Sequence, residues 1–229
     1  WCASLPNTVT SGWAGSPTIT PSKEIYNATL GIAIVAYTGN ATAGATFPHS
    51  GLGLGKTPFM VIVKGTAAAH GWQVYHEAVG NTSTLILNST AAANAQTYYW
   101  NNTSPTSELV TLGSGSDNNP AEAMIAYLFY ETDFCKPISW TANNSADGPM
   151  ANLGISVEWM LQKSTNAATE WGVMDNVRAP YNPCDVMIKA SAAVAEDSTY
   201  DAVDLLSNGF KLRENTGYNA TGRIQVGVA

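Results

Sequence analysis

The residues that most often carry acid–base chemistry are few in this chain and are not grouped along it. His49, His70 and His76 show neither the HExxH spacing of a zinc protease nor any other paired spacing. A glycosidase needs two carboxyl groups about 5 to 10 Å apart. The carboxylates that could supply such a pair are Glu77, Asp133, Asp147, Asp175, Asp204 and Glu214. Because no sequence pattern brings two of them together, we predict that the chain is not an enzyme and has no catalytic residues.

Neither a nucleotide site nor a metal site is indicated by the motifs. Residues 51–57, Gly-Leu-Gly-Leu-Gly-Lys-Thr, lack the GxxxxGK[ST] spacing of a phosphate-binding loop and precede a strand-like segment instead of a helix, so we interpret them as a turn. Cys2, Cys135 and Cys184 form no CxxC or Cys/His pattern. A single Cys135–Cys184 disulfide stays open for an oxidising compartment. We expect no metal and no cofactor.

The composition excludes several classes of partner. Only 12% of the 229 residues are charged, the net charge is −7, and the 10 basic residues are scattered singly. Nucleic-acid binding and attraction to an anionic membrane surface both need clustered Lys and Arg, so we expect neither. No apolar stretch approaches the ~20 residues that span a bilayer, so we expect no membrane insertion. Solubility must come from the abundant Ser, Thr and Asn side chains, a composition common in secreted and virion proteins.

Short β-type segments bounded by Gly, Asn and Pro follow one another along most of the chain. Only residues 91–96 and 191–196 have helical propensity, and each is short enough for a turn. We therefore predict an all-β protein of β-sandwich units, of jelly-roll or lectin-like type, with inner sheets packed on each other. The predicted strands are residues 31–37, 59–64, 72–76, 84–87, 97–100, 109–112, 124–130, 159–163, 170–174, 186–189, 202–206, 210–213 and 223–228.

The chain repeats itself. The pair Lys64 and Trp72 recurs as Lys163 and Trp171, with the same spacing within each pair and an offset of about 99 positions. Repetition at this period indicates duplicated structural units. We predict a first β unit over residues 25–134 and a second over 135–229, with residues 32–130 and 138–228 superposing as related folds.

The two Trp-containing strands carry the candidate binding residues. The main interpretation is that Trp72 and Trp171 are buried core residues, each with its indole N–H satisfied by the backbone. The alternative is an aromatic platform for a sugar ring, with His76 or Asp175 as its polar partner. The candidate contacts for a glycan or a protein partner are Tyr75, His76, Trp100, Asn101, Asn102 and Asp175.

Residues 1–24 differ in composition from the rest of the chain. They are rich in Ser, Thr, Pro and Gly and offer no periodic apolar face. We predict an extended N-terminal arm or connector whose Trp1, Leu5 and Trp13 bury against a neighbouring subunit or another protein. The chain begins without Met, so the sequence is compatible with a further segment upstream of Trp1.

An ordered series of motifs resembles a module that recurs in tail-fibre and other structural proteins of marine tailed bacteriophages, notably those of cyanobacteria. The resemblance extends over residues 25–229, although residues 155–163 depart from the aromatic-Pro pair and Val-Met-Ile-Lys strand of the family. The matching segments are residues 53–58, 61–64, 72–76, 87–92, 100–107, 125–127, 147–149 and 205–213.

The resemblance implies a place on the virion more than an activity, because no function or catalytic residue is known to us for this module. We expect an exposed tail-fibre or appendage domain that contacts the host cell surface, where a glycan is a candidate ligand. By analogy with phage fibres we expect a homotrimer. The alternative is a capsid decoration or cement protein, or a head fibre, that binds other virion proteins. Either way, we expect the chain on the exterior of a phage particle.

Overall fold

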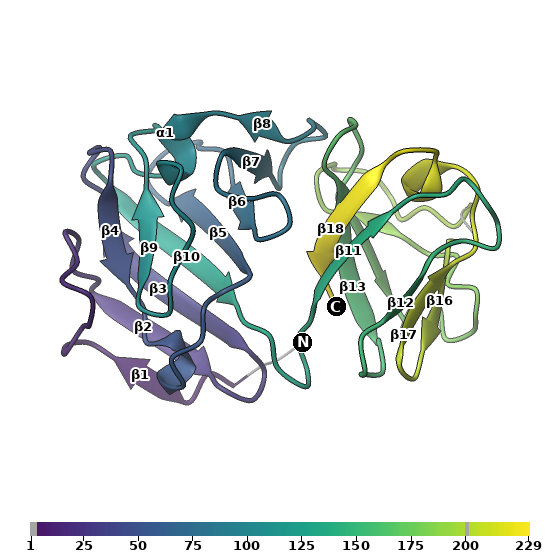
Figure 1. Cartoon of the computed structure of the whole chain (residues 1–229), viewed down its shortest axis with the longest axis horizontal. Coiled ribbons are helices and arrows are strands. Elements are labelled where there is room, and N and C mark those ends of the chain that lie inside the picture. The colour runs from purple at the N-terminus through teal and green to yellow at the C-terminus, as the bar shows by residue number, and fades with distance from the viewer. Residues whose placement is uncertain (1–3, 200–201) are drawn as a thin grey trace. The chain divides into compact units, whose positions relative to one another are not determined.

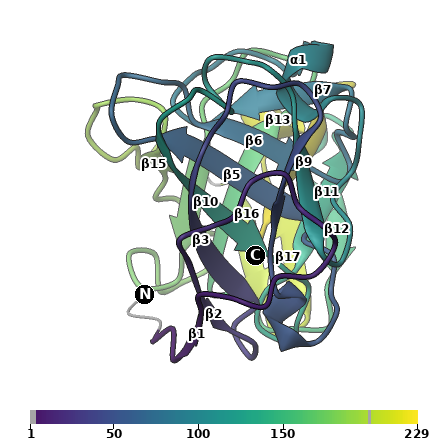
Figure 2. The ribbon, with the colours of Figure 1, turned by 90° about the vertical axis from the view of Figure 1, so that its left-hand side faces the viewer.

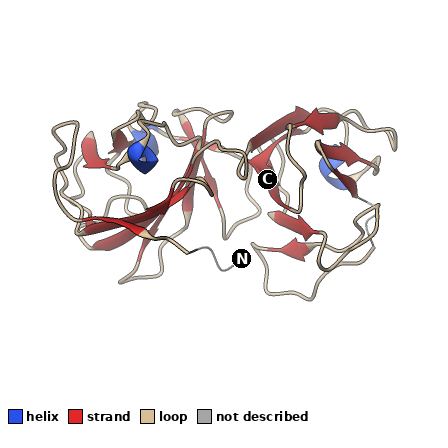
Figure 3. Ribbon diagram, turned by 90° about the horizontal axis from the view of Figure 1, so that it is seen from below, coloured by secondary structure: helices blue, strands red, loops and turns tan. Residues whose placement is uncertain are grey.

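The computed structural model describes residues 4–199 and 202–229, and nearly all of its regular structure is β-strand (Figure 1, Figure 3). The chain divides into two compact units. Unit 1 runs to Ile86 and resumes from Asn94 to Cys135, and unit 2 comprises Leu87–Ala93 and Lys136–Ala229. This division lies one residue beyond the predicted boundary, but the assignment of Leu87–Ala93 to unit 2 is not predictable from composition.

Unit 1 is built on a large antiparallel sheet. Within the described residues its strand order is β1-β2-β3-β10-β5-β6-β7-β8, and a second sheet pairs β4 with β9. Figure 2 shows β3, β10, β5 and β6 as neighbouring strands. The elements are β1 (Asn7–Val9), β2 (Lys23–Asn27), β3 (Ile32–Thr38), β4 (Ala45–Pro48), the 3-10 helix η1 (Gly51–Gly53), β5 (Met60–Gly65), β6 (Gln73–His76), β7 (Ser83–Ile86), β8 (Asn94–Ala95), α1 (Thr97–Trp100), β9 (Leu109–Leu112) and β10 (Ala123–Phe129).

The core of unit 1 lies between these two sheets. Along β3, Ala33, Val35 and Tyr37 are buried while the residues between them are less so, the alternation expected of a strand with one face on a core. From the second sheet, Phe47 stacks on Tyr37 with ring centroids 4.6 Å apart. Two sheets enclosing one apolar layer give the β-sandwich-like build that the sequence predicts.

Unit 2 repeats this plan with fewer strands. Within the described residues, one sheet has the order β11-β18-β13-β14-β15 and the other β12-β17-β16. Met160 and Met174 from the first sheet and Phe210 and Leu212 from the second belong to one buried cluster. The elements are β11 (Pro137–Thr141), β12 (Met150–Asn152), β13 (Trp159–Ser164), β14 (Gly172–Asp175), β15 (Ile188–Lys189), β16 (Val203–Leu206), β17 (Gly209–Leu212), the 3-10 helix η2 (Gly217–Asn219) and β18 (Ile224–Val228).

The strand registers of the two units correspond. In unit 1, Val63 lies opposite Gln73 on β6 and Ala126 on β10. In unit 2, Gln162 lies opposite Gly172 on β14 and Gly227 on β18. Val63 and Gln73 precede their counterparts by 99 positions, the offset of the repeated Lys and Trp residues, and Ala126 precedes Gly227 by 101. The strand neighbours also correspond, since β3-β10-β5-β6-β7 matches β11-β18-β13-β14-β15.

One predicted strand is wrong. Thr97–Trp100 forms the single helical turn α1, which ends at Asn101 in the left-handed conformation with its N–H bonded to Thr97 O. The aromatic residues of this turn favour β-structure locally. Packing overrides that preference, because the helical turn brings Trp100 edge-on to Tyr75 in the core, with ring centroids 5.8 Å apart.

The described part of the predicted arm is not a free connector. β1 pairs with β2 as the edge of the large sheet, and Ile19 belongs to the core cluster of unit 1. The main chain of Thr18 and Ile19 also bonds to Thr46 on β4. The prediction fails because the buried contacts of this segment are non-periodic and come from strands distant in sequence. Its residues therefore belong to unit 1.

Candidate functional site

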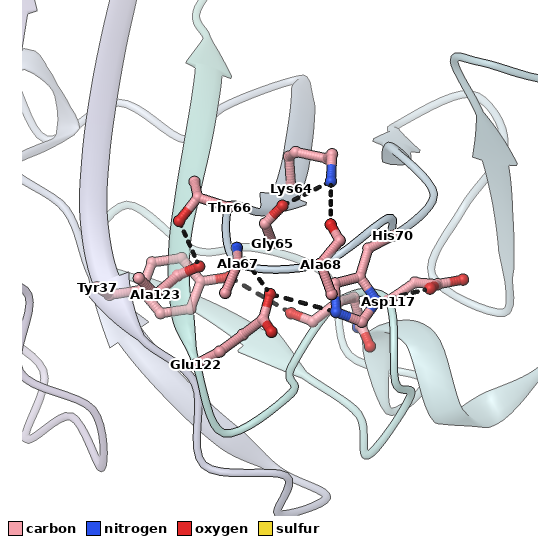
Figure 4. Close-up of polar contacts among 11 residues, drawn as sticks. Tyr37, Lys64, Gly65, Thr66, Ala67, Ala68, His70, Asp117, Glu122 and Ala123 are labelled. Carbon is pink, nitrogen blue, oxygen red and sulfur yellow. Dashed lines mark hydrogen bonds and ion pairs between the residues drawn. The ribbon is translucent and has the colours of Figure 1, made fainter.

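A lysine holds the turn that follows β5. We call residues 64–70 the Lys64 turn. Lys64 Nζ donates to Gly65 O at 2.6 Å and to Ala68 O at 3.2 Å, as Figure 4 shows. The lysine is half-buried, whereas Thr66, Ala67, Ala68 and Ala69 are exposed. The ammonium therefore fixes a short turn whose outer surface faces solvent.

His70 ties the same turn to the loop before β10 (Figure 4). Its Nδ1 lies 3.1 Å from Asp117 Oδ1 and its Nε2 lies 3.2 Å from Glu122 Oε1, while Gln73 Nε2 donates to Asp117 Oδ2 at 3.3 Å. The imidazole ring therefore lies between two carboxylates and joins the Lys64 turn to this loop.

Unit 2 holds its corresponding turn with Lys163, which is 0% exposed. Lys163 Nζ lies 3.1 Å from Ser164 O, 3.5 Å from Ala167 O and 3.3 Å from Thr169 Oγ1. A fourth oxygen, Thr90 O, lies 3.1 Å away. Burial lowers the pKa of Lys163 to about 8, and the nearby Glu170 partly offsets this effect.

The main chain of Leu87–Ala93 completes this second turn. Besides its contact with Lys163, Thr90 O accepts from Thr169 N at 2.9 Å, and Ala93 N donates to Thr165 O at 2.7 Å. These contacts use the backbone of the segment, so they place little demand on its side chains. Lys163 therefore joins its own turn to a segment that is distant in the sequence.

A buried asparagine latches the loops of unit 1. Asn119 is 0% exposed, and its Nδ2 lies within 3.2 Å of Asn40 Oδ1, Thr42 O and Gly113 O. Its Oδ1 accepts from Asn40 N at 2.9 Å. One amide thus satisfies main-chain groups from two loops at once.

Unit 2 has the same latch. Asn219 Nδ2 lies within 3.1 Å of Asn143 Oδ1, Ser145 O and Glu214 O, and its Oδ1 accepts from Asn143 N at 3.1 Å. Each contact matches one made by Asn119. The sequence contains the signal for half of this motif, because residues 37–40 and 140–143 match and both end in Asn.

An open pocket of about 420 Å³ lies beside the segment between β15 and β16. Lys189 Nζ pairs with Asp197 Oδ2 at 2.9 Å in its wall, and Ser191 Oγ donates to Glu170. Lys189, Asp197 and Glu170 of this pocket therefore already have partners. Its lining residues are Glu170, Lys189, Ala192, Val194, Ala195, Glu196, Asp197, Ser198 and Thr199.

Three of the residues predicted to contact a ligand are buried, so this prediction is wrong for them. Tyr75 and Trp100 belong to the core cluster of unit 1, and His76 is buried and packs edge-on to Phe59. His76 Nδ1 accepts from Ala78 N at 3.1 Å, which shapes the turn after β6. These side chains do not reach a ligand on the surface in this conformation.

The remaining candidates lie in turns. Asn101 and Asn102 are exposed, and both adopt positive φ angles, as is common for Asn at helix ends and in turns. Asp175 is half-buried, accepts from Val177 N and pairs with Arg178. These hydrogen bonds hold the pKa of Asp175 below its ordinary value although burial opposes them. The structure does not bring the predicted site residues into one cluster.

The two repeated tryptophans differ in burial. Trp171 is 1% exposed, as predicted for a core residue. Trp72 is only half-buried and stacks on Tyr127, with ring centroids 6.1 Å apart and an interplanar angle of 21°. The prediction of full burial is therefore wrong for Trp72, which lies just before β6.

Of the three N-terminal residues predicted to contact a partner, the structure describes two. Leu5 and Trp13 are half-buried, and Trp1 lies outside the described residues. Another exposed pair, Val177 and Tyr181, is not predicted from the sequence, and these side chains are 85% and 83% exposed on the loop after β14. Their exposure has no periodic signal because the loop is irregular and contains Pro180 and Pro183.

Two further observations concern metals and membranes. Among the described residues, no group of three or more His, Cys, Asp or Glu side chains is placed to hold a metal ion. Within those same residues, no helix has the length and apolar character needed to cross a membrane.

Comparison with known proteins gives one match. Residues 1–227 match the sequence model of a domain of unknown function, DUF7483. The chain belongs to this family. No curated protein and no solved structure matches the chain. Membership in DUF7483 therefore gives the domain its family without assigning it an activity.

Proposed function

We propose that this DUF7483 chain is a structural protein of a bacteriophage virion, and specifically an exposed tail-fibre or appendage domain that contacts the host cell surface. The observation that carries the proposal is the recurrence of the lysine-held turn and the asparagine latch in both units. Repeated β units favour display and assembly over one catalytic cleft. The resemblance of residues 25–229 to a marine phage module supports the same location.

We also infer that the two units arose by internal duplication. Thr66 and Thr165 support this inference, because each donates through both its N–H and its hydroxyl to one carbonyl, Ala123 O in unit 1 and Ile224 O in unit 2. Contacts of this detail recur in two folds by descent more readily than by chance. Superposition of residues 32–130 on 138–228 is the direct comparison.

A domain that contacts the host surface needs an exposed contact for a glycan, and the loop after β14 offers one. Tyr181 is exposed beside Asn182, and the Asp175–Arg178 pair lies on the same loop. An exposed aromatic ring can stack on a sugar ring, so this loop replaces the buried residues as the candidate glycan contact. Other virion proteins are the remaining expected partners, and a homotrimer is expected by analogy with phage fibres.

The second candidate function is a capsid decoration or cement protein. The exposed apolar side chains Val177 and Val194 favour it, since both lie on unit 2 loops where a neighbouring protein could cover them.

Competition for host cells separates the two functions. Purified chain should bind cells of the host and reduce adsorption of the phage that encodes it, and Tyr181→Ala should weaken both effects. Thr221→Ala, an exposed change elsewhere on unit 2, is the matched control. Chain that ignores cells but rebinds stripped capsids would support decoration. Chain that binds neither cells nor particles would contradict both candidates.

A further inference from the structure

The Lys64 turn of unit 1 and the turn held by Lys163 in unit 2 correspond, but only the second receives a segment from elsewhere in the sequence. Lys163 Nζ donates to Thr90 O in addition to the carbonyls of its own turn. Among the described residues, Lys64 Nζ contacts only Gly65 O and Ala68 O. An ammonium group has three donors, so Lys64 retains one for another acceptor.

Unit 2 contains a counterpart of the segment that docks on Lys163. Leu87–Ala93 lies between Thr84 and Asn94, which pair across β7 and β8. The corresponding bridge in unit 2 joins Met187 and Asp197. The residues between β15 and this bridge, 190–196, therefore occupy the place of Leu87–Ala93, and we call them the 190–196 segment.

The 190–196 segment presents the backbone groups that docking would use. By this correspondence Ala193 O takes the place of Thr90 O, and Glu196 N takes the place of Ala93 N. Both residues are exposed, and neither group has a hydrogen-bond partner within the described part of the chain. Val194, between them, is 59% exposed.

The Lys64 turn offers matching groups. Thr66 corresponds to Thr165, which accepts from Ala93 N, and Thr66 O has no hydrogen-bond partner among residues 4–199 and 202–229. One contact is not reproduced, because His70 N already donates to Ala68 O whereas Thr169 N donates to Thr90 O. Two of the three docking hydrogen bonds thus have complementary, unused groups on the two surfaces.

We propose that the Lys64 turn binds the 190–196 segment of a second copy of this chain, with Lys64 Nζ donating to Ala193 O and Glu196 N donating to Thr66 O. Because the two surfaces differ, the contact is heterologous and joins copies head to tail, closing into a ring or extending as a filament. The negative charge of Glu196 near Lys64 adds attraction. The inference does not depend on a virion role.

Sedimentation of the purified chain tests this contact. The wild-type chain should form species larger than the monomer at high protein concentration. Lys64→Met, which removes the ammonium, and Glu196→Pro, which removes the N–H, should each abolish these species. Lys56→Met removes a lysine whose Nζ bonds to Glu131 O and should leave association unchanged.

Mixing the two variants gives the sharper test. Lys64→Met keeps its 190–196 segment and Glu196→Pro keeps its Lys64 turn, so a mixture should form only one-to-one dimers. If Lys64→Met fails to fold, Ala67→Arg blocks the exposed outer surface of the turn and leaves the Lys64 hydrogen bonds in place. A monomer at every concentration, or association that survives these variants, would overturn the proposal.

Discussion

The side chains of Asn119 and Asn219 each connect loops that are distant in the sequence. Replacing either by Ala leaves buried carbonyls and an N–H without partners, so we expect a loss of about 3 kcal/mol or more in the free energy of unfolding of that unit. Asn176→Ala, an exposed change, is the control. Denaturant unfolding measures both, and equal effects would show that the latches do not stabilise the units.

Glu214 makes the stability of unit 2 depend on pH. Burial raises its pKa from 4.5 to about 7, against the opposing hydrogen bond from Tyr218 N and the charge of Arg223. Since the folded state holds the proton more tightly than the unfolded state, this stability is fully present below pH 4.5 and is lost as pH rises through about 7. Glu214→Gln should remove the dependence and be more stable than wild type at pH 8. Parallel stability curves for the two proteins between these values would contradict the assignment.

The two repeated tryptophans should differ in their contribution. Trp171→Ala removes a fully buried side chain, and we expect it to cost about 3 to 5 kcal/mol. Trp72→Ala removes a half-buried ring stacked on Tyr127, and we expect about 1 kcal/mol. Thermal unfolding of the two variants provides the comparison. A Trp72 variant as unstable as the Trp171 variant would contradict this difference and support the prediction that both are core residues.

At the scale of the element, two parts of residues 1–24 should contribute differently to the stability of unit 1: the edge strand β1 and the segment around the buried Ile19. Deleting residues 1–10 removes β1, an edge strand paired on one side only, and should destabilise unit 1 slightly. Deleting residues 1–20 also removes the buried Ile19 and its bonds to Thr46, and should cost substantially more. Circular dichroism during thermal unfolding measures both truncations. Equal stability of the two would support the arm that the sequence predicts.

The strands that the sequence predicts are those with local signals. Residues 32–38 and 123–129 carry the apolar pattern of a strand packed on a core, and their positions need no knowledge of the fold. β1 and β12 are each three residues long, too short for an apolar pattern of their own, so they are specified by their partners.

The candidate site was harder to predict because its contacts join distant residues. Lys64 and Lys163 stand out as a repeat, but the sequence does not show that Thr90 docks on one of them. The Asn219 latch joins residues 76 positions apart. Exposed Tyr and Trp side chains often bind sugars, which favours aromatic residues as ligand contacts, but Tyr75 and Trp100 fill the core.

At the scale of the molecule, each of the two β units has a lysine-held turn and an asparagine latch. The low charge of the chain and the backbone character of these contacts are compatible with the virion role that we propose. In that setting a turn in one copy and a segment in another would extend the intramolecular docking at Lys163 into an assembly.

Immunogold electron microscopy of intact particles tests the central claim most directly. Antibody raised against this chain should label particles of the encoding phage on their exterior, at the tail if the chain is a fibre or appendage domain. Pre-incubation of the antibody with purified chain should remove the label, which controls for specificity. Unlabelled intact particles, from infected cells whose lysate contains the chain, would contradict a place on the virion surface.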